Sequence, residues 1–110
     1  MKQWDVVYYR FEKEGLHPAV IISNEERCYN PDLDHVNVLL CTSAKLNREP
    51  KKNEVILDET DGLNWKTAVR CDVVYLLPKS GLEKHQGTVS PLRRKEIART
   101  IVHCLRLPVA

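Results

Sequence analysis

The stretch SPLRRKEIARTIVHCLRLP, residues 90–108, decides the fold because it is the one clear helix in a chain that otherwise consists of strand-like segments. Ser90 is a candidate N-cap, and Pro91 follows at the first helical position, where its missing N–H costs nothing. Pro108 ends the pattern, which predicts a helix over residues 91–107. Its apolar stripe consists of Leu92, Ile97, Ile101, Cys104 and Leu105.

Upstream of this helix, apolar runs rich in β-branched residues alternate with polar turns. Residues 24–34 are polar, contain Asn-Pro and indicate a loop. The run VLLC at 38–41 is apolar on both faces and predicts a central strand. The predicted strands are residues 4–11, 19–23, 36–43, 54–58, 67–77 (one long strand or two short ones, broken near Arg70 and Asp72) and a short strand within 78–89. A single C-terminal helix after short strands predicts a mainly β (α+β) protein, a small antiparallel barrel capped by the helix.

Length and composition are typical of one globular domain over residues 1–110. Hydrophobic residues make up 43% and charged residues 29% of the chain, which excludes disorder. The longest uncharged apolar run, residues 73–78, is far too short to cross a membrane. The chain begins with Trp4, Asp5 and Arg10 where a signal peptide needs an apolar stretch. We therefore expect a cytoplasmic protein without a membrane partner.

The charges are unevenly distributed although the formal net charge is only +2. Residues 1–62 hold 8 Lys or Arg and 12 Asp or Glu, whereas residues 63–110 hold 9 and 3. One interpretation is a solvated basic helix face together with acidic loops. The other is a basic half that binds a polyanion such as a nucleic acid. Charge alone does not decide between them.

The cysteines and histidines do not form a metal-binding pattern. They are widely spaced, with no C-x-x-C pair, so we expect free buried cysteines, no zinc site and no cofactor. The sequence also lacks a P-loop, a G-x-G-x-x-G loop, a G-x-S-x-G elbow and H-E-x-x-H, which leaves the nucleotide-binding, α/β-hydrolase and metalloprotease classes unsupported. The four cysteines are Cys28, Cys41, Cys71 and Cys104, and the four histidines are His17, His35, His85 and His103.

Polar residues within apolar strands mark the candidate site, because burying them without partners is costly. Arg70 and Asp72 lie two positions apart on one strand face, with Cys71 on the other. They form either a structural ion pair or an anion site, in which the guanidinium binds a phosphate and the carboxylate orients it or accepts a proton. Thr42 and Ser43, at the end of the central strand, either complete that site or form a strand-end turn.

The order of these segments resembles the MazF/PemK/Kid family of toxin endoribonucleases from toxin–antitoxin pairs. The resemblance covers nearly the whole chain and implies an SH3-like antiparallel barrel with a C-terminal α-helix, as one MazF/PemK-like domain over residues 1–110. The similar segments are DVVYYRF (5–11), GLHPAVIISN (15–24), VNVLLCTSAK (36–45), AVRCDVVYLLPKSGL (68–82) and GTVSPLRRKEIARTIVHCLRL (87–107).

The resemblance also implies a reaction: metal-independent cleavage of single-stranded RNA, in which the RNA's own 2′-OH attacks the adjacent phosphate. Such a reaction needs a base near the 2′-OH, a cation on the phosphate and an acid for the leaving oxygen. Carried over from the family, Asp72 is the base or orients it. Arg70 stabilises the phosphate and can donate a proton, and Thr42 is a hydrogen-bond donor.

The chain departs from the family pattern at several of these positions. His17 stands where the family has an arginine; it is a weaker phosphate clamp but a possible general acid or base. Val73 stands where the family has Gln, and the following Arg is lost. The first loop, EKEG (12–15), is shorter than in the family, with its Glu at Glu12.

The remaining predictions concern substrate contacts and partners. We expect Glu12, Ser43 and Lys45 to contact single-stranded RNA, and the resemblance implies a homodimer and an acidic antitoxin protein that lies over the basic groove. Two alternatives stay open. A non-catalytic SH3-like barrel relative would bind nucleic acid or, like CcdB, a protein target without cleaving RNA. The other is a structural SH3-like interaction domain, which predicts that Arg70 and Asp72 form a closed ion pair at the surface, with no cavity beside it.

Overall fold

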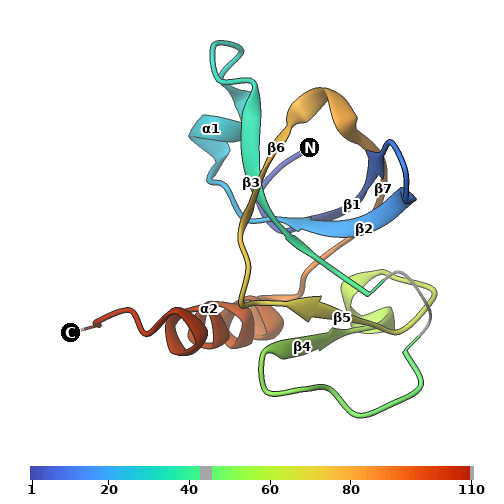
Figure 1. The fold of residues 1–110 in the computed structure, drawn as a ribbon, viewed down its shortest axis with the longest axis vertical. Helices are drawn as coiled ribbons and strands as arrows, with labels where there is room; N and C mark the ends of the chain where they lie inside the picture. Colours follow the sequence, from blue (N-terminus) through green and yellow to red (C-terminus); the bar gives the residue numbers. More distant parts are fainter. Residues whose placement is uncertain (43–45, 110) are drawn as a thin grey trace.

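The computed structural model describes residues 1–42 and 46–109, and shows a mainly antiparallel β structure with a C-terminal α-helix (Figure 1). The predicted fold class is thereby confirmed. A five-stranded antiparallel sheet has the order β6-β3-β2-β1-β7, and β4 and β5 form a separate pair. The elements are β1 (Asp5–Phe11), β2 (Gly15–Ile21), α1 (Glu25–Tyr29), β3 (His35–Leu40), β4 (Glu54–Leu57), η1 (Glu59–Asp61), β5 (Thr67–Arg70), β6 (Tyr75–Pro78), η2 (Lys79–Gly81), β7 (Leu82–Thr88) and α2 (Pro91–Leu105).

The five-stranded sheet is strongly curved but is not closed by hydrogen bonds within the described residues. Its edges are β6 and β7, which are joined through η2 at the top of Figure 1. β3 lies between β6 and β2, as predicted for an interior strand. The predicted barrel is therefore present as a curled sheet with the β4–β5 pair and α2 beside it.

Strand alternation divides the apolar side chains into two cores, because successive residues of a strand face opposite sides of the sheet. Val6 belongs to the core shared with β4, β5 and α2, where Val55, Val69 and Ile97 are buried. Its neighbour Val7 belongs to the other core, which lies under α1. The sheet is thus covered on both sides.

Three segments differ from the sequence-based expectation. β2 begins at Gly15 and ends at Ile21, whereas the predicted strand is 19–23. α1 lies within the predicted loop, because the Asn24 side chain accepts a hydrogen bond from the Arg27 N–H and begins a single helical turn of five residues. The segment 67–77 consists of two short strands, the second of the two predicted forms. The two strands belong to different sheets: residues up to Cys71, whose N–H donates to the Asn53 carbonyl, follow β4, whereas Tyr75 pairs with β3.

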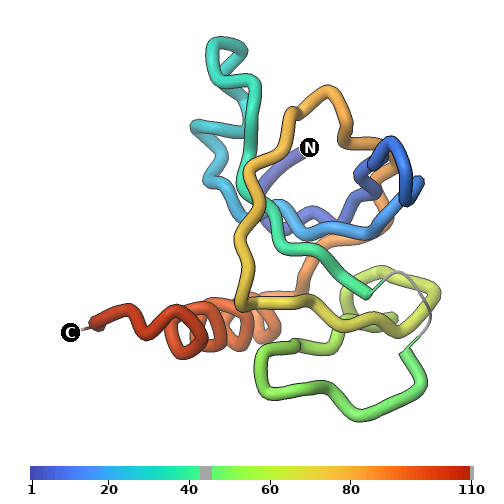
Figure 2. Tube along the Cα trace, in the orientation of Figure 1, coloured from blue at the N-terminus to red at the C-terminus, as the bar shows by residue number. Residues whose placement is uncertain are grey.

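α2 begins where predicted but ends at Leu105, two residues before the predicted end, because Arg106 adopts a left-handed conformation at φ 54°. Its capping and its stripe also differ from the prediction. The Ser90 side chain makes no capping bond; instead its backbone N–H donates to Asp61 Oδ1 at 2.8 Å. Only Ile97 of the predicted stripe is fully buried, whereas Leu92 and Leu105 are exposed. The body of the protein contacts the first half of the helix, where Arg93 donates to Asp61 and Ile97 is buried in the core. Figure 2 shows its C-terminal end and the following segment extending to one side.

The structure also bears on membrane insertion and the cysteines. No helix in the described part of the chain is long and apolar enough to span a bilayer. Cys28, Cys41, Cys71 and Cys104 are all free, and the first three are buried, as predicted.

Candidate active site

Arg70 and Asp72 lie on one side of the chain at the end of β5, as strand alternation predicts. Arg70 Nη2 is 3.6 Å from Asp72 Oδ2, and the two side chains are 48% and 36% exposed. Their neighbours Val69 and Cys71 are fully buried in the core. The two buried residues therefore anchor the backbone and hold the charged pair at the surface.

The Asp72 carboxylate has unused bonding capacity. Its Oδ1 atom is buried, yet it has no hydrogen-bond partner among the residues that the structure describes. A buried acceptor without a partner is costly and usually has a functional explanation or bound water. Arg70 approaches only Oδ2, and at a distance too long for a good hydrogen bond, so the ion pair does not satisfy the carboxylate.

Arg70 is not neutralised by the carboxylate that lies across from it. Glu54 is its register partner in β4, but the Glu54 carboxylate is bonded to Arg48 at 2.7 and 3.0 Å. These hydrogen bonds from Arg48 lower the pKa of Glu54 to about 2. At neutral pH Glu54 is therefore charged, and its carboxylate is bonded to Arg48 and not to Arg70. Arg70 is left with Asp72 as its only ion-pair partner within the described residues.

Thr42 joins the end of β3 to β5. Its backbone N–H donates to the Ala68 carbonyl at 2.9 Å, and the Ala68 N–H donates to Thr42 Oγ1 at 3.2 Å. The Thr67 hydroxyl donates to the Thr42 carbonyl, so in the 2.9 Å contact between the two Oγ1 atoms Thr42 is the donor. Thr42 thus lies beside Ala68, two positions before Arg70. Its hydroxyl proton is already used in the hydrogen bond to Thr67.

His17 and Glu12 occupy different surroundings. His17 contacts Phe11 edge-to-face, with ring centroids 5.5 Å apart, in a pocket of about 250 Å³ that Glu14, Leu40 and Tyr75 also line. Glu12 is exposed in the turn between β1 and β2. Ser43 and Lys45 lie outside the described residues.

The structure therefore brings some of the predicted residues together and not others. Arg70 contacts Asp72, and Thr42 is anchored to the same strand through Ala68. His17 is linked to Thr42 through the backbone. The Cys41 N–H donates to the Pro18 carbonyl, and His17 precedes Pro18 while Thr42 follows Cys41. Within the described part of the chain, no hydrogen bond joins His17 or Glu12 to the Arg70–Asp72 pair.

Sequence reasoning missed three side chains around this site. Thr67, which is fully buried, holds the Thr42 hydroxyl, and Glu14 and Tyr75 line the pocket with His17. A threonine at the start of an apolar strand was the one available signal for Thr67. Nothing in the spacing of Glu14 and Tyr75 indicates that they approach each other, because 61 positions separate them and only the curl of the sheet joins them.

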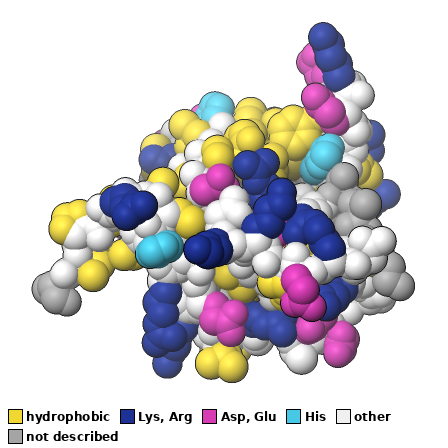
Figure 3. Space-filling view, turned by 60° about the horizontal axis from the view of Figure 1, so that its bottom comes forward, with side chains coloured by type: hydrophobic (Ala, Val, Ile, Leu, Met, Phe, Trp, Pro, Cys, Tyr) yellow, Lys and Arg dark blue, Asp and Glu magenta, His cyan; other side chains and the backbone are white. Residues whose placement is uncertain are grey.

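The site offers proton transfer and anion binding but no thiol nucleophile. Burial raises the pKa of Cys71 to about 12, and burial raises that of Cys41 as well, so both thiols stay protonated at neutral pH. Figure 3 shows Lys and Arg side chains gathered near the centre of the face formed by the α2 and β4 side of the molecule. That face suits an anionic ligand.

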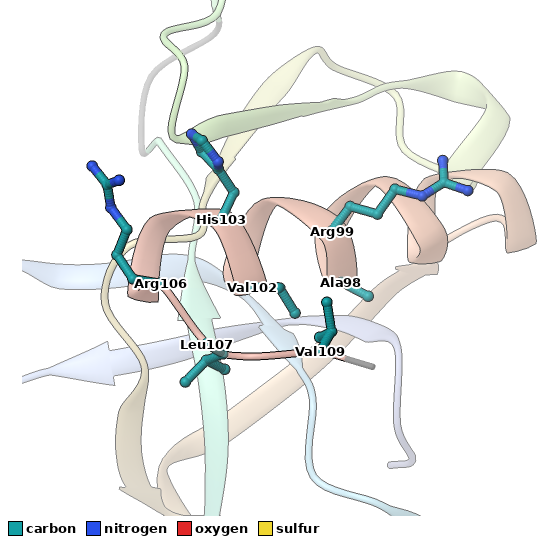
Figure 4. Close-up of a pocket in the computed structure, with 7 residues that line it drawn as sticks. All are labelled: Ala98, Arg99, Val102, His103, Arg106, Leu107 and Val109. Carbon is teal, nitrogen blue, oxygen red and sulfur yellow. The ribbon is translucent and has the colours of Figure 1, made fainter.

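A separate and larger groove lies along the C-terminal half of α2 and contains none of the predicted catalytic residues (Figure 4). Its volume is about 610 Å³. The floor is apolar, with Val102, Leu107 and Val109, and three basic side chains line it. These basic residues are Arg99, His103 and Arg106.

Comparisons with known proteins agree with this architecture. A structure described as an endoribonuclease in complex with its cognate antitoxin, from a mycobacterial species, superposes with a TM-score of 0.81 at 23% identity, covering 100% of this chain and 99% of that one. The Mycobacterium tuberculosis toxin MazF-mt6 gives 0.78 at 22% identity over 96% and 99%. A MazE–MazF structure from Deinococcus radiodurans gives 0.75 at 17% over 98% and 97%.

At these identities the superpositions show a shared fold, and the family assignment comes from the sequence. No curated protein sequence matches the chain. The family model described as PemK-like, MazF-like toxin of type II toxin-antitoxin system matches residues 2–105, nearly the full length. The chain therefore belongs to the PemK-like, MazF-like family of toxins from type II toxin–antitoxin systems.

Proposed function

We propose that this chain is the toxin of a toxin–antitoxin pair and a metal-independent endoribonuclease that cleaves single-stranded RNA. The observation that carries the proposal is the Arg70–Asp72 pair, whose two side chains are partly exposed and 3.6 Å apart, in a chain of this family. A closed structural ion pair would have no acceptor to offer.

In the proposed reaction the RNA supplies its own nucleophile. The Asp72 carboxylate accepts the proton of a 2′-OH as that oxygen bonds to the adjacent phosphorus and the bond to the 5′-oxygen breaks. Arg70 stabilises the negative charge that develops on the phosphate. His17 gives the leaving 5′-oxygen a proton, since an imidazole exchanges protons readily near neutral pH, whereas a guanidinium does not.

Thr42 has a conditional role in this scheme. Its hydroxyl proton is held by Thr67 in the present arrangement. To donate to a phosphate oxygen it has to rotate away from Thr67 and give up that bond. We therefore assign Thr42 the positioning of the β3 end on β5, together with one phosphate hydrogen bond made only when substrate is bound.

The proposed partners are RNA, an acidic antitoxin and a second copy of the chain. Relatives of the same fold are described in complex with a cognate antitoxin or with MazE. The apolar groove with its basic side chains along α2 is complementary to an acidic antitoxin segment that carries apolar residues (Figure 4). The exposed Val73, Val74 and Leu76 on and beside edge strand β6 support a homodimer. We infer a cytoplasmic site of action from the RNA substrate, with Glu12, Ser43 and Lys45 contacting that RNA.

The test is digestion of a long mixed-sequence RNA in the presence of EDTA. Wild type is compared with Arg70→Ala and Thr42→Ala. The matched control is Arg10→Ala, which removes an arginine from an exposed ion pair with Glu83 elsewhere on the sheet. We expect discrete cuts from wild type and the control, and none or very few from the two site variants. Cuts that persist in both site variants would contradict the assignment.

A second candidate function is favoured by the engaged Thr42 hydroxyl, which leaves one expected phosphate donor occupied. Under this alternative the chain binds nucleic acid or a protein target and does not cleave RNA. Intact RNA at high protein concentration, together with retained RNA binding, would select this alternative.

A further inference from the structure

The pocket around His17 brings together aromatic and acidic side chains from distant parts of the chain. Phe11 and Glu14 come from the β1–β2 hairpin, Leu40 from β3 and Tyr75 from the start of β6. Its volume of about 250 Å³ is below the range of about 300–1,000 Å³ that is usual for drug-sized ligands. The pocket therefore suits one flat ring system and not a whole nucleotide.

The aromatic wall of the pocket is held in place before any ligand arrives. Phe11 packs edge-to-face on Tyr9, with centroids 4.7 Å apart, and on His17 at 5.5 Å. Gly15, at φ 78°, supplies the left-handed residue that returns the chain from β1 into β2 and pairs with Phe11. A rigid aromatic surface loses little conformational entropy when a base stacks on it. Unstacked RNA bases are commonly bound in this way.

Glu14 gives the pocket its chemical selectivity, because it is the one carboxylate among the lining residues. An ionised carboxylate only accepts hydrogen bonds and can accept two side by side. The Watson–Crick edge of guanine presents two adjacent donors, N1–H and N2–H. Adenine and cytosine present one donor beside an acceptor, and uracil one donor between two acceptors, so each of them directs a lone pair at the carboxylate.

We propose that this pocket binds a single unstacked guanine of the RNA, with Glu14 accepting from guanine N1–H and N2–H and the aromatic wall of Phe11 and Tyr75 contacting the ring. This inference rests on the proposed function, because it makes the pocket the specificity site of the same RNA-binding surface. Leu40 lies two residues before Thr42, and Tyr75 three residues after Asp72. The chain therefore connects the base pocket directly to the proposed cleavage site.

The test uses fluorescence anisotropy with short 2′-O-methyl oligonucleotides, which lack the attacking 2′-OH and are not cleaved. A single guanine in a uridine background is compared with adenine, cytosine or inosine at the same position. We expect the guanine oligonucleotide to bind about 5- to 150-fold more tightly than the adenine one, since a bidentate pair discriminates by about 1–3 kcal/mol. Inosine, which lacks the N2 amino group, is expected to fall between them.

The deciding variant is Glu14→Gln, with Glu26→Gln as its control because Glu26 is an exposed carboxylate on α1. Glu14→Gln is expected to abolish most of the guanine preference, and Glu26→Gln to leave it unchanged. Tyr75→Leu is expected to weaken binding of all bases alike. No guanine preference in wild type, a preference that survives Glu14→Gln, or no binding of any oligonucleotide would overturn the proposal.

The two proposals fail in different ways. RNA cleavage that depends on Arg70 but shows no preference for guanine would retain the nuclease and reject the base pocket. A guanine preference that depends on Glu14 in a protein that never cleaves RNA would retain the pocket and reject the nuclease. Each result therefore overturns one proposal and leaves the other in place.

Discussion

Two arginine–carboxylate clusters in this molecule have the same chemistry and opposite surroundings. Arg93, from α2, donates to Asp61 Oδ2 at 2.9 Å, to the Ile56 carbonyl at 2.7 Å and to Asp58 Oδ2 at 3.2 Å. The Arg93 side chain is 21% exposed and that of Asp61 is fully buried. Among the described residues, the ion-pair partner of Arg70 is Asp72 alone, at 3.6 Å and partly exposed.

The difference lies in how completely each carboxylate is satisfied. Asp61 also accepts the backbone N–H groups of Asp58 and Ser90, so it fixes η1 and the start of α2 to β4. Asp72 keeps one oxygen without a partner among the described residues. Loss of one member of a closed buried cluster destabilises the native structure, because it leaves the other buried groups without partners, whereas a partly exposed surface pair contributes little stability.

The largest effect is expected from breaking the buried cluster. Asp61→Ala leaves Arg93 and two backbone N–H groups without their acceptor and should lower the free energy of unfolding by about 3–5 kcal/mol. Urea denaturation measures this loss, and Asp61→Asn, which keeps one acceptor oxygen, should lose less. If Asp61→Ala unfolds at the urea concentration of wild type, the cluster does not hold α2 in place.

Removing the open pair should affect activity and not stability. Arg70→Ala and Asp72→Asn should keep a urea midpoint close to that of wild type, because exposed pairs contribute little. Under the proposed function their RNA cleavage rate should fall by about 10²–10³-fold. Initial cleavage rates and urea midpoints on the same preparations separate the two effects. A loss of stability like that of Asp61→Ala would make this pair structural.

The Arg48–Glu54 pair is an intermediate case, since the Glu54 side chain is only 4% exposed while Arg48 is at the surface. The pKa of Glu54 is lowered from 4.5 to about 2, mainly by the hydrogen bonds from Arg48. Because its pKa is lower in the folded state than in the unfolded chain, its stabilisation is complete above about pH 4.5 and is lost as the pH falls through 2.

Glu54→Gln should therefore lower the free energy of unfolding by about 1–3 kcal/mol at neutral pH and flatten its acid dependence. Thermal unfolding between pH 2 and 7 measures both quantities. An acid dependence identical to that of wild type would contradict the assignment of this carboxylate as the titrating group.

The smallest effect is expected at the exposed pair between Arg10 and Glu83. Arg10 Nε donates to Glu83 Oε2 at 2.8 Å across β1 and β7, with both side chains in contact with solvent. Glu83→Gln should leave the thermal midpoint unchanged, and so should added salt, because solvent screens the attraction. A clear drop in the midpoint would mean that good hydrogen-bond geometry matters more here than exposure.

Much of the architecture and the open pair could be predicted without the structure. Alternation along one strand predicted that Arg70 and Asp72 share a side with Cys71 opposite, and the structure confirms it because Val69 and Cys71 are buried. The helix after Ser90 was equally predictable. The capping group was not, because Asp61 lies 29 positions earlier and reaches Ser90 only after η1 folds against α2.

The candidate site divides in the same way. Local pattern identified Thr42, yet the direction of its hydroxyl depends on Thr67, which a distant strand supplies. Glu14 and Tyr75 could not be paired in advance, since they meet only through the curl of the sheet. The helical turn of α1 escaped prediction because one five-residue turn, begun by Asn24, carries too short a pattern to be told from a loop.

The sequence by itself determined which segments form strands, where the final helix begins and that one arginine and one aspartate share a strand face. These features depend on side-chain alternation and on residues next to one another in the chain. Only the tertiary structure decided which ion pairs form. Arg93 binds Asp58 and Asp61, Arg48 binds Glu54, and Arg70 lies beside Asp72 at the surface. Which carboxylate an arginine reaches depends on burial and on strand register across the fold, and these arise only when distant segments pack together.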